Sequence, residues 1–161
     1  MPLKKQEIYQ KIIESLEQEL NTMIQSAKNA KDAATNEESK AENKYDTRGL
    51  EASYLAGAQA KRATELREMI NLFKTTPVQN YDSTTPIGHT ALVKLQHDDH
   101  ITWYFVAPQE GGLTLHYQDY TIFVISPFSP VGQALMGRKQ GDEFELEIKN
   151  EIREYEIISV Q

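Results

Sequence analysis

Cysteine is absent from this chain of 161 residues, which excludes a disulfide framework and any metal site built on thiolates. No apolar stretch approaches the roughly 20 residues that a membrane-spanning helix needs, so we expect no membrane partner. The first residues, Met1 to Lys5, lack the apolar run of a signal peptide, which favours a cytoplasmic protein. Basic residues are also in deficit, 17 against 24 acidic ones. The resulting negative net charge argues against a protein that binds nucleic acid mainly by neutralising phosphates.

Proline is absent between Lys4 and Lys74, and the only glycines there are Gly49 and Gly57. Within this stretch apolar residues recur at steps of three and four, the period of one apolar face on a helix. A first series consists of Ile8, Ile12, Leu16, Leu20, Met23 or Ile24, Ala27, Ala30 and Ala34, and a second of Ala52, Leu55 or Ala56, Gln59, Ala63, Leu66, Ile70 and Phe73. Residues 1–76 are therefore predicted to form a long antiparallel α-helical hairpin, a coiled coil of two helices.

The turn of this hairpin is predicted near residue 41. Pairing Ile8 with Phe73 in an antiparallel register places it there, because partners across a hairpin lie equally far from its turn. The predicted tip is acidic, and its carboxylates are those of Asp32, Glu37, Glu38, Glu42 and Asp46. Taken alone, such a hairpin is also typical of a coiled-coil structural or dimerisation module, in which charged turn residues are simply solvated.

Pro77 ends the second helix, since proline disfavours helical structure at the residue before it. Beyond it, alternating, β-branched and aromatic residues predict a small antiparallel β-sheet. Its six strands are expected around residues 90–95, 101–107, 113–117, 121–125, 143–148 and 153–160, with one short helix at 131–136. The fold class is therefore α+β, with the hairpin followed by a compact C-terminal domain, residues 77–161.

The most informative stretch of the chain begins with Ser126-Pro127-Phe128, continues with Ser-Pro-Val-Gly at residues 129–132 and runs through Gly137 to Gly141-Asp142. Locally it predicts a loop stiffened by proline, a short helix from Val131, a helix stop at Gly137 and a second glycine turn. The stretch resembles the C-terminal signature of bacterial Gre-type transcription elongation factors, which runs roughly Ser-Pro-Ile-Gly-x-Ala-Leu-Leu-Gly-Lys-x-x-Gly-Asp.

This resemblance implies a C-terminal domain like that of FK506-binding proteins and a partner, bacterial RNA polymerase. By position, the polymerase-binding residues are Ser129, Pro130, Val131 and Gly132. Gre factors insert their hairpin into the secondary channel of the polymerase and stimulate cleavage of backtracked nascent RNA at its 3′ end. The resemblance therefore implies a protein that is not itself an enzyme and has no cofactor of its own, because Mg²⁺ is held mainly by the polymerase. We expect a monomer.

The predicted tip resembles the family in part. Glu42-Asn43-Lys44-Tyr45 is similar to the second half of the tip motif Gly-Asp-x-x-Glu-Asn-x-x-Tyr, with one residue fewer before the tyrosine. Glu42 is thus the catalytic candidate and the candidate ligand to a polymerase-bound Mg²⁺, which prefers oxygen ligands. Ser39 stands where the family has its first acid, and Glu38 is the candidate substitute. Because some Gre homologues enter the channel without stimulating cleavage, a non-cleaving regulator, an inhibitor or competitor, is the alternative.

Overall fold

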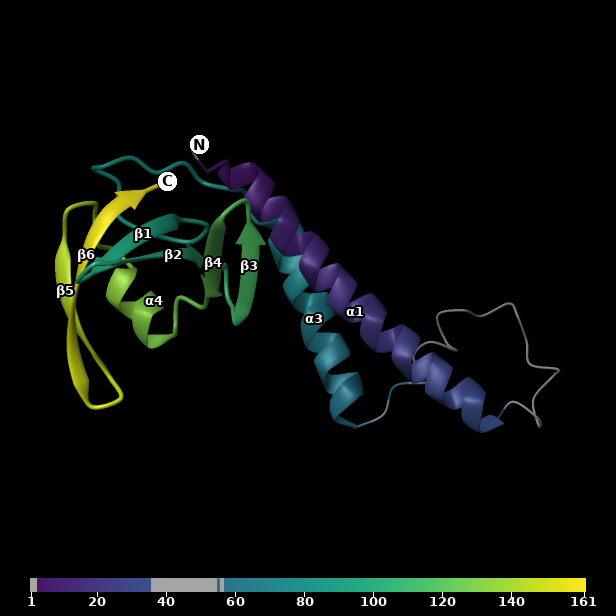
Figure 1. Ribbon diagram of the computed structural model, residues 1–161. Coiled ribbons are helices and arrows are strands. Elements are labelled where there is room, and N and C mark those ends of the chain that lie inside the picture. Colours follow the sequence, from purple (N-terminus) through teal and green to yellow (C-terminus); the bar gives the residue numbers. More distant parts are fainter. Residues whose placement is uncertain (1–2, 36–54, 56) are drawn as a thin grey trace. The chain divides into compact units, whose positions relative to one another are not determined.

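The computed structural model describes residues 3–35, 55 and 57–161 (Figure 1). By their contacts the residues divide into two units, one made of Met1–Ile12 with Leu72–Gln161 and the other of Ile13–Asn71. Over the described part of the chain, no helix combines the length and the apolar character that crossing a bilayer requires. The domain boundary between residues 76 and 77 stays a prediction.

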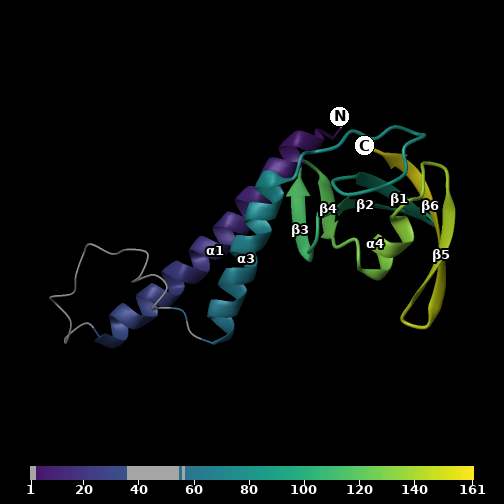
Figure 2. The same cartoon turned by 180° about the vertical axis from the view of Figure 1, so that it is seen from behind.

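Two helices form the predicted antiparallel pair. Helix α1 (Lys5–Thr35) and helix α3 (Ala58–Thr75) run side by side in both views (Figures 1 and 2). The Arg62 guanidinium donates to the Glu19 carboxylate at 2.9 Å, which joins the two helices. Of the predicted seam residues, Ile8, Ile12, Leu16, Leu66 and Phe73 are buried, whereas Leu20 is half-buried and Ala30 and Gln59 are exposed. The helical period of the sequence is therefore confirmed over the described residues.

The second helix begins later than the sequence predicts. The apolar series runs back to Ala52, but Leu55 is not helical and α3 starts at Ala58. Gly57, just before it, has a φ of 56°, a left-handed conformation that a right-handed helix cannot include and that glycine adopts without strain. Leu55 is nevertheless buried in one cluster with Ala27 and Ala63. The predicted turn near residue 41 lies outside the described residues.

The C-terminal part contains a six-stranded sheet in the order β3-β4-β2-β1-β6-β5. Its strands are β1 (Leu92–His97), β2 (His100–Val106), β3 (Leu113–Tyr117), β4 (Tyr120–Ile125), β5 (Glu143–Ile148) and β6 (Glu151–Val160). All six predicted segments are confirmed. One pairing departs from the antiparallel expectation, because β2 and β4 are parallel. The β3–β4 hairpin places β3 at the sheet edge, so that β4 returns beside β2 in the same direction.

The two faces of the sheet are covered differently. Helix α4 (Pro130–Leu135) packs on one face, over a core that includes Val93, Val106 and Ile157. Neighbouring strand residues point to opposite faces, so Phe105 lies on the other face from Val106. There its ring lies 5.8 Å from that of Tyr9, in the second turn of α1. The N-terminal turns of α1 are thus part of the sheet domain's core.

Tyr9 connects three elements at this point. Its ring lies 5.4 Å from that of Phe73 in α3, and its hydroxyl donates to the Phe73 carbonyl oxygen at 2.5 Å. Close by, the Tyr117 hydroxyl donates to the Glu7 carboxylate. This hydrogen bond lowers the pKa of Glu7 and raises the pKa of Tyr117. The first turns of α1 are therefore held to the sheet by both apolar packing and hydrogen bonds.

Candidate functional site

The Ser-Pro segment predicted as a binding site forms a turn at residues 126–129 that leads into the first residues of α4, and we call residues 126–132 together the signature loop. Ser129 caps α4 with an extended backbone (φ −66°, ψ 159°), and its side-chain oxygen accepts from the Gly132 N–H at 3.1 Å. Pro130 occupies the first helical position, where the missing N–H of proline is not needed. The Ser-Pro pair therefore starts the helix at Pro130, one residue before the predicted Val131.

Ser126 closes the signature loop on itself. Its carbonyl oxygen accepts from the Ser129 backbone N–H at 3.2 Å and from the Ser129 hydroxyl at 2.7 Å. Its own hydroxyl oxygen accepts from the Phe128 N–H at 3.1 Å. Two prolines fix φ within the same few residues. The backbone of the loop is thus set by local hydrogen bonds and by proline before any partner binds.

Gly132 is required by this closure. A Cβ atom at this position would lie 2.0 Å from the Ser126 carbonyl oxygen and 2.9 Å from the Pro127 Cα, distances that no real contact reaches. The structure brings the four predicted site residues together, but they are unequally accessible. Pro130 is exposed, Ser129 and Val131 are half-buried, and Gly132 is buried. The role of Gly132 in the structure is therefore to shape the loop from within.

Phe128 is a residue of the signature loop that the sequence motif does not single out, because its position is not one of those that match. The residue is 70% exposed. A large aromatic residue between two prolines is a visible feature of the sequence, but its exposure depends on how the loop folds. Phe128 and Pro130 are thus both exposed residues of the loop.

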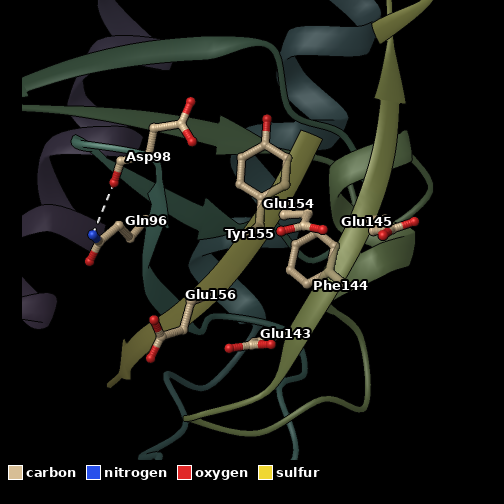
Figure 3. A pocket seen from close by; sticks show the side chains of 8 residues that line it. All are labelled: Gln96, Asp98, Glu143, Phe144, Glu145, Glu154, Tyr155 and Glu156. Atoms are coloured by element: carbon tan, nitrogen blue, oxygen red, sulfur yellow. Dashed lines mark hydrogen bonds between the residues drawn. The ribbon is translucent and has the colours of Figure 1, made fainter. Parts of the chain in front are cut away.

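A second surface, on β5 and β6, is strongly acidic (Figure 3). In the strand register Glu143 faces Glu156 and Glu145 faces Glu154, and all four side chains are exposed. The alternation in Glu-Phe-Glu-Leu-Glu predicts acids on one face of β5, but their partners on β6 follow only from the register. Among the described residues, no three acidic or histidine side chains are grouped so that they could hold a metal ion.

Replacing Glu145 with lysine is expected to stabilise the protein. Like charges directly opposite each other on two strands are unfavourable, and an opposite-charge pair with Glu154 contributes roughly 0.5 kcal/mol. The free energy of unfolding in urea, measured at low ionic strength, would show the gain. Glu147→Lys is the matched control, because it changes the net charge equally while its cross-strand partner is Ile152. Equal gains in both variants would contradict a pairwise origin.

The predicted tip residues Glu42, Glu38 and Ser39 lie outside the described residues. Their roles, and that of Glu42 as a ligand to a polymerase-bound Mg²⁺, stay predictions from the sequence. The candidate site that the structure does describe is the signature loop with the strand ends around it.

Comparison with known proteins places this site in a family. Residues 82–161 match the family model described as "Transcription elongation factor, GreA/GreB, C-term". This span contains the whole sheet, α4 and the signature loop. Through its C-terminal domain the chain belongs to the GreA/GreB family, and it is a transcription elongation factor of the Gre type.

Solved structures also align with most of the chain. The GreA factor homolog 1 (Gfh1) of Thermus thermophilus is 22% identical, over 92% of this chain and 94% of that one, with a TM-score of 0.38. Gfh1 of Thermus aquaticus is 19% identical, over 95% and 93%, with a TM-score of 0.40. A transcription elongation factor GreA/GreB from Nitrosomonas europaea is 19% identical, over 60% and 78%, with a TM-score of 0.37.

Proposed function

We propose that this protein binds bacterial RNA polymerase, inserts its helical hairpin into the secondary channel and stimulates cleavage of backtracked nascent RNA. The family match of residues 82–161 is the observation that carries this proposal, because Gre-family factors bind RNA polymerase. The protein is not an enzyme itself in this proposal. It supplies groups to a reaction whose metal site belongs to the polymerase, and it holds no cofactor of its own.

The signature loop supports the binding half of the proposal. Its backbone is fixed by Ser126, Ser129 and the two prolines, so little conformational entropy is lost when a partner contacts it. Pro130 and the half-buried Ser129 and Val131 are the surface that the loop offers to the polymerase. Gly132 contributes indirectly, because it allows the loop to close.

The sequence of the tip supports the cleavage half. Phosphodiester cleavage requires that a water oxygen attack phosphorus while the ribose 3′ oxygen leaves and gains a proton. A second bound Mg²⁺ can generate the attacking oxygen nucleophile and stabilise the charge of the displacement. The Glu42 carboxylate is the group that this chain would bring to such a metal or to the attacking water, and Glu38 is the second candidate.

The test uses backtracked polymerase complexes that carry 3′-labelled nascent RNA. The wild-type protein is expected to release short labelled 3′ fragments, and Glu42→Gln should lower the release rate by at least about tenfold, as the loss of a metal-directed carboxylate does. Glu37→Gln is the matched control, since it removes a neighbouring acid that the family motif does not include. Equal rates for the two variants would contradict the assignment of Glu42.

Ser39 favours one alternative, a regulator that enters the same channel without stimulating cleavage. It replaces the first acid of the family's tip motif, so the chain offers one motif carboxylate fewer. In the same assay such a regulator would bind the polymerase, release no labelled fragment and compete with a cleaving factor. A further variant, Ser39→Asp, would then restore fragment release if the missing acid is the cause.

A further inference from the structure

Strand β5 forms one edge of the sheet, because among the described strands only β6 pairs with it. In both views it lies at the outer end of the sheet (Figures 1 and 2). The Ile157 N–H of β6 donates to the Asp142 carbonyl oxygen at 2.9 Å, just before β5 begins. Backbone groups alternate in direction along an antiparallel strand. Every second residue from Asp142 therefore turns its backbone to β6, whereas Glu145 and Glu147 turn theirs to the open side.

This edge is open to a further strand. Unpaired N–H and C=O groups at a sheet edge are a template for another extended chain, and proteins usually protect them with proline, bulges or charged side chains. Strand β5 contains no proline or glycine. At its start, the Glu143 carbonyl oxygen accepts from the Arg138 guanidinium at 3.4 Å. The accessible part of the edge is therefore residues 145–147, where charge is the protection that remains.

That charge is negative and lies on one face. Phe144 belongs to the core on the α4 side of the sheet, so Glu145 and Glu147 project from the opposite face. Glu145 faces Glu154 of β6 there, beside the pair of Glu143 and Glu156 (Figure 3). A hollow on this surface has no lysine or arginine among its described lining residues. A strand added at β5 would therefore meet two rows of carboxylates.

The basic side chains of the neighbouring strands do not neutralise this surface. Arg153 of β6 lies 3.7 Å from the Glu151 carboxylate, and Lys94 of β1 lies over the Trp103 ring, 5.7 Å from its centroid. Lys149 follows β5, in the turn that leads to β6. Among the described residues, no ion pair joins a carboxylate of β5 to a basic side chain. The acidic edge is thus available to cations of a partner.

Charge also selects the kind of partner. A second copy of β5 would place glutamate against glutamate, which is unfavourable, and nucleic acids are themselves anionic. An extended polypeptide with lysine or arginine at every second position would form opposite-charge pairs with Glu145 and Glu147. Its intervening residues would lie on the other face, beside the half-buried Leu146, and apolar side chains suit that position.

We propose that the open edge of β5 binds an extended basic segment of a partner protein as a seventh strand, antiparallel to β5. Lysine or arginine residues of the segment lie directly opposite Glu145 and Glu147 and exchange backbone hydrogen bonds with them. In such strand addition the main chain supplies affinity and the alternate side chains supply specificity. Antiparallel pairing is the more stable direction per residue. This contact does not rest on the proposed function, and it uses no residue of the signature loop.

The test measures the fluorescence anisotropy of a labelled peptide, Ser-Lys-Val-Lys-Val-Lys-Ser, with the full-length protein at low ionic strength. The wild-type protein is expected to bind it saturably. The double variant Glu145→Lys/Glu147→Lys should weaken binding by at least about tenfold, because like charges replace opposite ones. Glu68→Lys/Glu110→Lys is the matched control, since it changes the net charge equally at exposed positions outside β5. A cooperative thermal transition would show that each variant is folded.

Modified peptides test the backbone pairing without any change in the protein. Residues directly opposite each other exchange both hydrogen bonds when their backbone groups face one another. N-methylation of the lysines should therefore abolish binding, and N-methylation of the valines should not. Equal effects of the two methylations would overturn strand pairing, and loss through valine methylation alone would overturn the antiparallel direction.

Two further outcomes concern the location of the contact and its charge. Equal binding by the wild type and Glu145→Lys/Glu147→Lys would overturn the assignment to β5. The same holds if the control variant Glu68→Lys/Glu110→Lys loses binding to the same extent. The peptide Ser-Glu-Val-Glu-Val-Glu-Ser should not bind, and binding as tight as that of the lysine peptide would overturn the basic character of the partner. Absence of binding of the lysine peptide to the wild type would overturn the contact itself.

Discussion

Gly132→Ala is expected to lower the free energy of unfolding of the C-terminal domain by about 2 kcal/mol. Two effects oppose each other at this position. Alanine is the better helix former, which favours the variant by roughly 1 kcal/mol. The new Cβ, however, would stand 2.0 Å from the Ser126 carbonyl oxygen, a backbone atom that can move only if the loop opens. Overpacking of this kind costs roughly 3 kcal/mol, so the clash prevails.

Unfolding in guanidinium chloride, followed by circular dichroism, would measure this loss. Gln133→Ala is the control, because Gln133 is the next residue of the same helix and is exposed, so its substitution should change stability by less than about 0.5 kcal/mol. Polymerase binding should fall for Gly132→Ala as well, since opening the loop displaces Pro130 and Phe128. If the two variants were equally stable, the close approach to Ser126 would not be what requires glycine here.

Local patterns were sufficient to predict most elements of the fold. The helical seam through Ile8, Leu16 and Leu66 and the six alternating segments after Pro77 are confirmed, because each is a property of neighbouring residues. The parallel pairing of β2 with β4 was not predictable in the same way. It depends on the position of the β3–β4 hairpin in the sheet. That position is set by contacts between residues distant in the sequence, which periodicity does not encode. The start of α3 at Ala58 was not predictable either, because it follows the left-handed backbone conformation of Gly57, which apolar periodicity does not encode.

In the candidate site, too, local features were predictable from the sequence and long-range contacts were not. That Ser129 and Pro130 start a helix follows from the local chemistry of caps and of proline, and the structure contains this cap. The need for glycine at position 132 does not follow from local chemistry, because the atom that excludes a side chain there belongs to Ser126, across the closed loop. The exposure of Phe128 also emerges only when the loop is folded. The tip acids remain sequence predictions.

Tyr9 is the position where we expect the largest loss of stability. Tyr9 is 6% exposed and its ring packs against Phe73 and Phe105, so Tyr9→Ala should lower the free energy of unfolding by about 3–5 kcal/mol, as for other buried aromatic residues. Tyr9→Phe keeps the ring and loses the hydrogen bond to the Phe73 carbonyl oxygen, which is worth about 1 kcal/mol. Denaturant unfolding of both variants separates the contribution of packing from that of the hydroxyl.

The same hydroxyl makes stability depend on pH in the alkaline range. Burial raises the pKa of Tyr9 from 10.0 to about 12. The pKa of Tyr9 is higher in the folded than in the unfolded protein. The contribution of its hydroxyl to the free energy of unfolding is therefore complete below about pH 10 and is lost as the pH rises towards about 12. Tyr9→Phe removes this contribution, while Tyr81, Tyr104 and Tyr117, whose pKa values are also raised, remain in both proteins. The difference in unfolding free energy between wild type and Tyr9→Phe should therefore shrink over this range. A difference that stays constant with pH would contradict the burial of the neutral Tyr9 hydroxyl as the cause of the pH dependence.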